Sequence, residues 1–426
     1  MGLTILLLVF LITMLMGIPI AFSLGIAALS AALYQGIPEP IVFQRMVAGI
    51  NVFSLLAIPF FIFAGELMLR GGIAIRLVRF ADALVGRVRG GLGVVNVLTS
   101  MLFGGISGSA VADTSALGSV MIPMMREQGY DDDYAINVTV TSSIAGVMIP
   151  PSHNMILYAL AAGGGISISS LFLAGIVPGI IMCLCLTVAA YLVAIRRGYP
   201  SKVFPGWRAV VYTAAGAIPG LMTVVVIIGG VLSGVFTVTE SAAVGAIYAL
   251  AVTALFYRSL SLRDFWESVT QTIRTTAMVM ILVGTATAFA YFLAVYQVPA
   301  AILHLLTSIS DNPIVIFLLI NIALLALGLF MDMAALILIC TPIFLPVVVR
   351  MGMDPVQFGM VMMMNLGLGL TTPPVGGCLF VGCAIAKVRI EHVVKTIWPF
   401  YLAIVVALML TTYVPAVSMT LPNLFR

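Results

Sequence analysis

Charged residues are rare in this chain and gather in short clusters between long apolar runs. Of the 426 residues, 8% are charged and 62% are hydrophobic, and the mean hydropathy is +1.22. Soluble domains carry roughly 25% charged residues. Apolar runs inside a bilayer must satisfy their own backbone hydrogen bonds, which favours helices. The sequence therefore predicts an all-α polytopic membrane protein, and its basic clusters show no nucleic-acid-binding pattern.

The basic clusters set the orientation of the apolar segments. The positive-inside rule predicts that the clusters at 70–89, 196–208, 258–274 and 387–395 lie in the cytoplasm, with both chain termini outside. The stretch 259–274 is amphipathic and predicts a helix on the cytoplasmic membrane surface. The predicted transmembrane helices, about ten, are 3–17, 19–35, 50–69, 134–162, 171–195, 209–232, 238–257, 275–296, 356–386 and 397–420.

Two further segments predict re-entrant hairpins. The segment 91–130 begins and ends near the cytoplasm, and its centre is rich in Gly and Ser. Irregular backbone at membrane depth is tolerated only where it is buried in protein or lines a cavity. The segment 313–349, broken at Gly328–Asp332, must enter from the periplasmic side. Residues 1–200 and 201–426 then form two inverted repeats, each with a hairpin followed by a broken helix, at 134–162 and 356–386.

Each hairpin carries an aspartate in apolar surroundings, Asp113 in the first and Asp332 in the second. A charge at the centre of a membrane helix costs at least about 2.5–3.5 kcal/mol, so such residues mark ion or substrate sites. Each aspartate is followed by a Pro-Pro break, in IPPS at 149–152 and in TTPPVG at 371–376. This repeated arrangement predicts the binding site of a secondary transporter.

The breaks and hairpin tips predict at least two sites for Na⁺. Proline removes backbone donors and leaves carbonyl oxygens free, and alkali cations favour such oxygen ligands. A proton carried on either aspartate is the alternative coupling ion. The half-helices that follow the breaks present unpaired N–H groups to an anionic substrate. The predicted Na⁺ ligands are Ser107, Gly108, Ser109, Asp113, Ile149, Pro150, Gly328, Asp332, Thr371, Thr372, Pro373 and Gly376, and the predicted substrate-binding residues are Ser109, Ser152, His153 and Asn154.

A purely structural interpretation exists for each motif. Gly-Ser runs can serve tight helix packing, and proline kinks are common in membrane helices. Glu66 lies four residues before Arg70, which predicts an ion pair at a helix end. Glu240, in FTVTESAAVG, fits a helix cap. Four motifs in a matched inverted order favour the transport site over packing alone.

At these motifs the chain resembles the large membrane subunit of tripartite ATP-independent periplasmic transporters, and the resemblance covers essentially the whole sequence. The motifs that carry it include AIPFFIFAGELM, RGGLG, SGSAVAD, MIPPSHN, GVFTVTESAAVGA, ICTPIFLPV and LGLTTPPVGGCLFV. The resemblance implies the ion-transporter superfamily fold, in which a transport domain moves like an elevator against a scaffold. It also implies Na⁺-driven uptake of organic acids across the bacterial inner membrane, without ATP. Within the family, SGSAVAD and IPPSHN look closer to the sugar-acid branch, including sialic acid carriers, than to the C4-dicarboxylate branch.

The resemblance implies two protein partners. One is a small four-helix membrane subunit, expected as a separate polypeptide because the extra N-terminal helices of fused versions are missing here. The other is a soluble periplasmic binding protein that delivers the substrate. One rival hypothesis is a stand-alone Na⁺/carboxylate symporter without a binding protein. The other is an intramembrane aspartyl protease using Asp113 and Asp332, but the Gly-x-Gly-Asp context is missing, so no enzymatic activity is predicted.

Overall fold

A computed structural model describes residues 1–425, and these residues are almost entirely helical. Helices account for 81% of them, and this range contains no strand. Six helices are long and apolar enough to cross a membrane alone, and eight spans result if each of two bent pairs counts as one. The all-helical, multi-pass class is as predicted. The count of ten stays a prediction, because the first two helices have only 14 and 16 residues.

The first half of the chain contains a helical hairpin and a broken helix where the sequence predicts them. Its elements are α1 (Gly2–Leu15), α2 (Ile20–Gln35), α3 (Glu39–Ile50), η1 (Phe53–Leu56), α4 (Ala57–Arg70), α5 (Ile73–Val85), α6 (Gly91–Ser107), α7 (Ala110–Glu127), α8 (Asp132–Ser142), α9 (Ala145–Met148), α10 (His153–Ala161) and α11 (Ile168–Arg197). The hairpin is α6 with α7. The broken helix runs from α8 to α10 and bends by 54° at the Pro-Pro break.

The second half follows a similar order. Its elements are α12 (Trp207–Leu232), α13 (Val238–Ala251), η2 (Val252–Phe256), α14 (Leu262–Val295), α15 (Val298–Ile309), α16 (Pro313–Gly328), α17 (Met333–Arg350), α18 (Pro355–Gly369), α19 (Gly377–Ala386), α20 (Ile390–Val394), α21 (Trp398–Tyr413) and α22 (Pro415–Leu424). The hairpin is α16 with α17, and the broken helix is α18 with α19. The predicted repeat boundary at 200/201 falls in the loop between α11 and α12. The inverted relation between the halves stays a prediction.

The structure adds to or corrects the predictions for two of the basic segments. The basic stretch 70–89 contains α5, whose apolar residues Ile73, Leu77 and Ala81 repeat every four positions and are buried. The stretch 259–274 is not a separate surface helix. It forms the first turns of α14, a continuous helix of 34 residues. The helix continues because no Gly or Pro interrupts it before Gly284.

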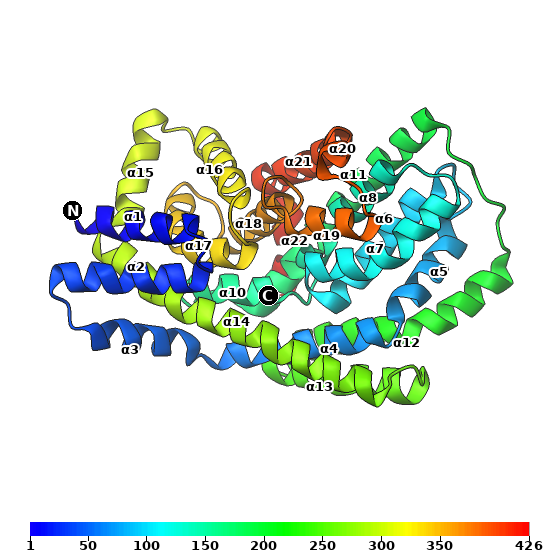
Figure 1. The fold of residues 1–426 in the computed structure, drawn as a ribbon, viewed down its shortest axis with the longest axis horizontal. Coiled ribbons are helices and arrows are strands. Elements are labelled where there is room, and N and C mark those ends of the chain that lie inside the picture. Colours follow the sequence, from blue (N-terminus) through cyan, green and yellow to red (C-terminus); the bar gives the residue numbers. More distant parts are fainter. Residues whose placement is uncertain (426) are drawn as a thin grey trace.

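Each half-helix that follows a break packs on the hairpin of the other half. Helix α10 contacts α17, and α19 contacts α7. A Cβ on Gly377, the first residue of α19, would lie 3.6 Å from a methyl group of Val111 in α7. Figure 1 shows α14 running along the lower side of the molecule, where it packs against α4, and α4 in turn packs against α13; the hairpins and broken helices lie above. One group of helices, which includes α14 and α4, therefore faces a second group, formed by the hairpins and the broken helices.

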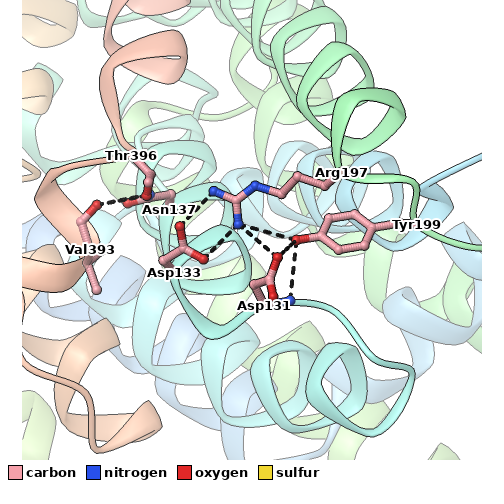
Figure 2. Close-up of polar contacts among 7 residues, drawn as sticks. All are labelled: Asp131, Asp133, Asn137, Arg197, Tyr199, Val393 and Thr396. Carbon is pink, nitrogen blue, oxygen red and sulfur yellow. Dashed lines mark hydrogen bonds and ion pairs between the residues drawn. The ribbon is translucent and has the colours of Figure 1, made fainter.

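An ion-pair cluster fixes one end of the broken helix (Figure 2). Arg197, the last residue of α11, donates hydrogen bonds to both carboxylate oxygens of Asp133, at 2.8 and 2.7 Å, and to Asp131 at 3.0 Å. The Tyr199 hydroxyl donates to Asp131 at 2.6 Å. Burial of the Tyr199 ring, with this bond to Asp131, raises the pKa of the phenol to about 12.

The same end of the broken helix is tied to the second half. The Asn137 side-chain amide donates to the Val393 carbonyl at 3.1 Å and to the Thr396 hydroxyl at 2.9 Å. The cluster therefore holds α8, α11 and the segment before α21 together. These contacts fix the α8 end of the broken helix, and the irregular part of that helix is the Pro-Pro break.

Candidate functional site: two hairpin tips and two helix breaks

Glycine and serine build the tip of the first hairpin. Helix α6 ends at Ser107, and Gly108 reverses the chain with a φ of +64°, a backbone conformation that glycine adopts without strain. Ser109 then caps α7 by accepting a hydrogen bond from the Ala112 N–H at 3.4 Å. The Ser107 hydroxyl donates to the Asp113 carboxylate. The tip therefore gathers Ser107, Ser109 and Asp113 as the sequence predicts.

Asp113 is completely buried, and it forms no ion pair with any of residues 1–425. Its second carboxylate oxygen, Oδ2, has no hydrogen-bond partner in that range. This oxygen lies 2.5 Å from the position that a Cβ on Gly146 would take, so only glycine leaves it uncrowded. A buried carboxylate without a counter-charge is costly, which makes this oxygen a natural ligand for a cation.

The first break leaves a row of carbonyl oxygens unpaired. The carbonyls of Ile149, Pro150 and Pro151 accept no hydrogen bond from any donor in the described range. A Cβ added to Gly105 would lie 3.0 Å from the Pro150 carbonyl oxygen, and one added to Gly108 would lie 3.0 Å from the Pro151 carbonyl oxygen. The hairpin tip therefore packs directly against these oxygens. The free carbonyls include those of Ile149 and Pro150, the two residues of this break that the sequence predicts as Na⁺ ligands.

The second break leaves the equivalent carbonyls unpaired. Those of Thr372, Pro373 and Pro374 accept no hydrogen bond within residues 1–425, whereas the Thr371 carbonyl accepts one from the Tyr401 hydroxyl at 2.6 Å. When the prolines are aligned, these three residues correspond to Ile149, Pro150 and Pro151. The row of free oxygens is thus present in both halves.

The second hairpin tip packs against the second break. The Val375 N–H donates to the Leu329 carbonyl at 3.2 Å. Gly328 lies against Gly369, with the Gly328 carbonyl oxygen 2.9 Å from the Gly369 Cβ position. The space around Gly376 is also closed, because its Cβ position is 2.8 Å from the Thr372 carbonyl oxygen. Gly328, Thr372 and Gly376 therefore belong to one packed region, as predicted.

Asp332 does not occupy the position of Asp113. Asp332 is the N-cap of α17 and accepts a hydrogen bond from the Ala334 N–H at 3.0 Å, as Ser109 caps α7. In both halves the capping residue precedes the first proline of the break by 41 positions: Ser109 precedes Pro150, and Asp332 precedes Pro373. In this register the counterpart of Asp113 is Leu336. Asp332 is also exposed, so the two halves share a backbone arrangement but not a charge arrangement.

A cavity of about 340 Å³ adjoins the first hairpin tip, and three of the predicted residues, Ser107, Ser109 and His153, line it. Helices α4 and α14 form the opposite wall, where sequence reasoning missed Gln271 and Thr275. Ser152 and Asn154 are buried and do not line the cavity. The cavity wall carries four hydroxyls, one imidazole and one side-chain amide, which suits a polar ligand: Ser107, Ser109, Ser115, Thr275, His153 and Gln271.

Among the described residues that line this cavity, Glu66 alone is charged. Its carboxylate lies 3.6 Å from the Arg70 guanidinium, which confirms the predicted pair. Glu240 likewise forms the predicted cap, in a capping box with Thr237. These two carboxylates therefore have structural roles, whereas one oxygen of the Asp113 carboxylate, Oδ2, has no partner within residues 1–425.

A second cavity of about 470 Å³ lies further along α14. Its wall includes Arg45 and Gly49 of α3, Thr287 of α14 and Pro342 of α17. The Arg45 guanidinium lies 4.4 Å above the Tyr291 ring. Helix α14 thus borders a cavity at each end of the face that it presents to the hairpins.

The comparisons with known proteins agree with this architecture. Residues 7–417 match the family model described as the tripartite ATP-independent periplasmic transporter, DctM component. The chain belongs to this family. It is 39% identical over 410 residues to the sialic acid TRAP transporter large permease protein SiaM of Vibrio cholerae, covering 96% of each chain. It is 37% identical over 424 residues to the C4-dicarboxylate large permease DctM of Rhodobacter capsulatus, again covering 96% of each.

The fold also resembles a solved membrane transporter. The YdaH transporter of Alcanivorax borkumensis superposes with a TM-score of 0.63 and 13% identity, covering 87% of both chains. At that identity the likeness concerns the fold alone. DctM components are transporter permeases, and the tripartite family includes small membrane and periplasmic binding components. The family assignment made from the sequence motifs is confirmed.

Proposed function

We propose that this chain imports an organic acid across the bacterial inner membrane by coupling its entry to Na⁺. A separate four-helix membrane subunit and a periplasmic binding protein complete the transporter, and the binding protein delivers the substrate. Relatives named for sialic acid and for C4-dicarboxylates make a sugar acid or a dicarboxylate the substrate class. The observation that carries the proposal is the matched row of free carbonyls at both Pro-Pro breaks.

The first Na⁺ site combines the Asp113 carboxylate with carbonyls from the first break. The free Oδ2 of Asp113 and the packing of Gly108 against the Pro151 carbonyl support this site. The second site uses the carbonyls of Thr372 and Pro373. Within residues 1–425, no three His, Cys, Asp or Glu side chains lie where they could hold a metal ion together. A donor set built mainly from carbonyls and hydroxyls favours an alkali cation over a transition metal.

The substrate site is the cavity beside the first hairpin tip. His153 and Ser109 face it, and His153 begins the nine-residue helix α10. The Ser152 side chain does not cap this helix, so its first N–H groups and the positive end of its dipole remain available to a carboxylate. Pairing with Arg70 limits the repulsion between Glu66 and an anionic substrate.

Transport proceeds by an elevator movement along α14. Gln271 and Thr275 of α14 border the first cavity, and Ala286 and Thr287 border the second. Eleven residues of helix separate Thr275 from Ala286, a rise of about 16 Å. A displacement of that order carries a site on the hairpin from one cavity to the other. The scaffold is then α14 with α4 and α13, and the moving part contains both hairpins and both broken helices.

Uptake into proteoliposomes tests the proposal. The vesicles contain this chain and its small subunit, an inward Na⁺ gradient, and labelled sialic acid or succinate, with the binding protein added or withheld. Uptake that requires both Na⁺ and the binding protein supports the tripartite mechanism. Uptake without the binding protein identifies a stand-alone symporter instead. Na⁺-independent uptake that responds to pH makes the proton the coupling ion.

A further inference from the structure

Helices α11 and α21 pack side by side and enclose a groove of about 500 Å³ on the outer face of the protein. Four side chains of α11, spaced four residues apart, line one wall: Leu184, Val188, Leu192 and Arg196. The first three are aliphatic and more than half exposed. The opposite wall comes from Pro399, Leu402 and Val406 of α21. The groove is therefore apolar along its length and cationic at one end.

The two adjacent arginines at the end of α11 have different environments. Arg197 is bound by Asp131 and Asp133 in the cluster of Figure 2. Arg196 lines the groove, is exposed, and forms no ion pair with any of residues 1–425. An unpaired guanidinium at the end of an apolar groove complements a ligand with a hydrocarbon tail and an anionic head.

The length of the groove matches one leaflet of a bilayer. Twelve residues of α11 separate Leu184 from Arg196, a rise of about 18 Å. The hydrocarbon of one leaflet is about 15 Å thick, half of the bilayer core. Trp398 precedes Pro399 in the chain and is 66% exposed, a position typical of the membrane interface. Arg196 and Trp398 therefore mark the head-group level of the cytoplasmic leaflet.

We propose that this groove binds an anionic phospholipid of the cytoplasmic leaflet. One acyl chain lies between α11 and α21, and Arg196 binds the phosphate of the head group. The lipid contacts α11, the last helix of the first half, and α21, which precedes the final helix α22. This inference concerns a site away from both cavities and does not depend on the proposed substrate or coupling ion.

Quenching of Trp398 fluorescence by brominated phospholipids tests the proposal. Trp207 and Trp266 are replaced by Phe, and the chain is reconstituted with its small subunit in nanodiscs that contain brominated phosphatidylglycerol or brominated phosphatidylcholine. We expect brominated phosphatidylglycerol to reach half-maximal quenching at a mole fraction approximately fivefold lower than brominated phosphatidylcholine does. One basic residue near an anionic membrane surface contributes about 1 kcal/mol, which corresponds to this factor. Arg196→Gln should abolish this preference, and Arg196→Lys should retain it.

A matched control separates the groove from general surface charge. Arg208 is also exposed, follows Trp207 in a cytoplasmic basic cluster and does not line the groove, so Arg208→Gln should leave the preference unchanged. Ala403→Phe, which fills the groove but keeps Arg196, should lower quenching by both lipids. Equal quenching by the two lipids in the unsubstituted groove would overturn the proposal. Quenching that occurs without the small subunit but disappears with it would assign the groove to a protein helix and would also overturn it.

Discussion

The first proposed Na⁺ site can be tested without changing any ligand or charge, by the substitution Gly146→Ala. The added Cβ would lie 2.5 Å from Asp113 Oδ2, a separation that real Cβ atoms essentially never show. The carboxylate must move by several tenths of an ångström or more to relieve the contact. The oxygen ligands of Ca²⁺ lie within a range of only about 0.3 Å, at about 2.3–2.6 Å, so a movement of this size is enough to take an oxygen out of coordination in a site of comparable size.

The expected magnitude follows from the loss of one charged ligand contact. Interactions with charged groups contribute about 1.5–3 kcal/mol, and each 1.4 kcal/mol changes an equilibrium constant tenfold. The Na⁺ concentration for half-maximal uptake should therefore rise by roughly 10- to 150-fold. Overpacking also lowers stability by about 1–3 kcal/mol, so a packing control is needed.

Gly367→Ala is that control. Its Cβ would lie 2.7 Å from the Ile144 Cγ2 methyl, which places a similar clash against hydrocarbon. Both variants should unfold at lower temperature than the unsubstituted protein in a detergent thermal melt. Only Gly146→Ala should shift the Na⁺ dependence of uptake in proteoliposomes. A normal Na⁺ dependence in a folded Gly146→Ala variant would refute the site at Asp113.

Four further predictions follow from named contacts. Asp113→Ala should weaken the Na⁺ dependence of uptake while the protein stays folded, because it removes a proposed ligand, and wild-type Na⁺ affinity would remove Asp113 from the site. Thr372→Ala keeps the proposed carbonyl ligand but removes the hydroxyl that donates to the Leu368 carbonyl at 2.7 Å. This variant should weaken the Na⁺ dependence by loosening the break, and wild-type affinity would show that the hydroxyl does not support the site. In a cysteine-free background, Ser107→Cys and Phe330→Cys should change their labelling reciprocally between inward- and outward-facing states, and equal labelling from both sides in every state would contradict alternating access. The raised pKa of Tyr199 stabilises the fold below pH 10, the ordinary value for tyrosine, and this stability should be lost as the pH rises through about 12. Tyr199→Phe should flatten that part of a melting-temperature profile against pH, and an unchanged profile would exclude Tyr199 as its source.

The hairpins and breaks could be predicted because single residues determine them. Gly108 must reverse the chain between α6 and α7, and two consecutive prolines interrupt a helix wherever they occur. Helix α5 has a sequence signal of the same kind, since its apolar residues recur every four positions, but the arginines of this segment predicted only its cytoplasmic location. The capping role of Asp332 also has a sequence signal, an aspartate directly before a helical apolar run.

The remaining features depend on tertiary packing and have no local signal. Nothing near Gly146 in the sequence indicates that it lies against Asp113, and nothing near Gln271 or Thr275 places them opposite Ser107. Asn96 donates to the Thr139 hydroxyl at 2.6 Å, and that bond joins α6 to α8 across 43 positions. Such contacts arise only when separate helices have docked.

The difference between the two tips gives the proposed ion sites unequal electrostatics. At the first tip a carboxylate is fully buried, whereas Leu336 occupies the same register at the second. The burial cost of Asp113 is relieved only when a cation or a proton arrives, so the first site has the stronger electrostatic drive to bind one. The second site rests mainly on neutral carbonyl oxygens, so a cation there adds net positive charge. That charge favours an anionic substrate nearby. The matched breaks thus place free carbonyl oxygens in both halves, and because only the first tip carries a buried aspartate, we expect the first proposed site to fill before the second.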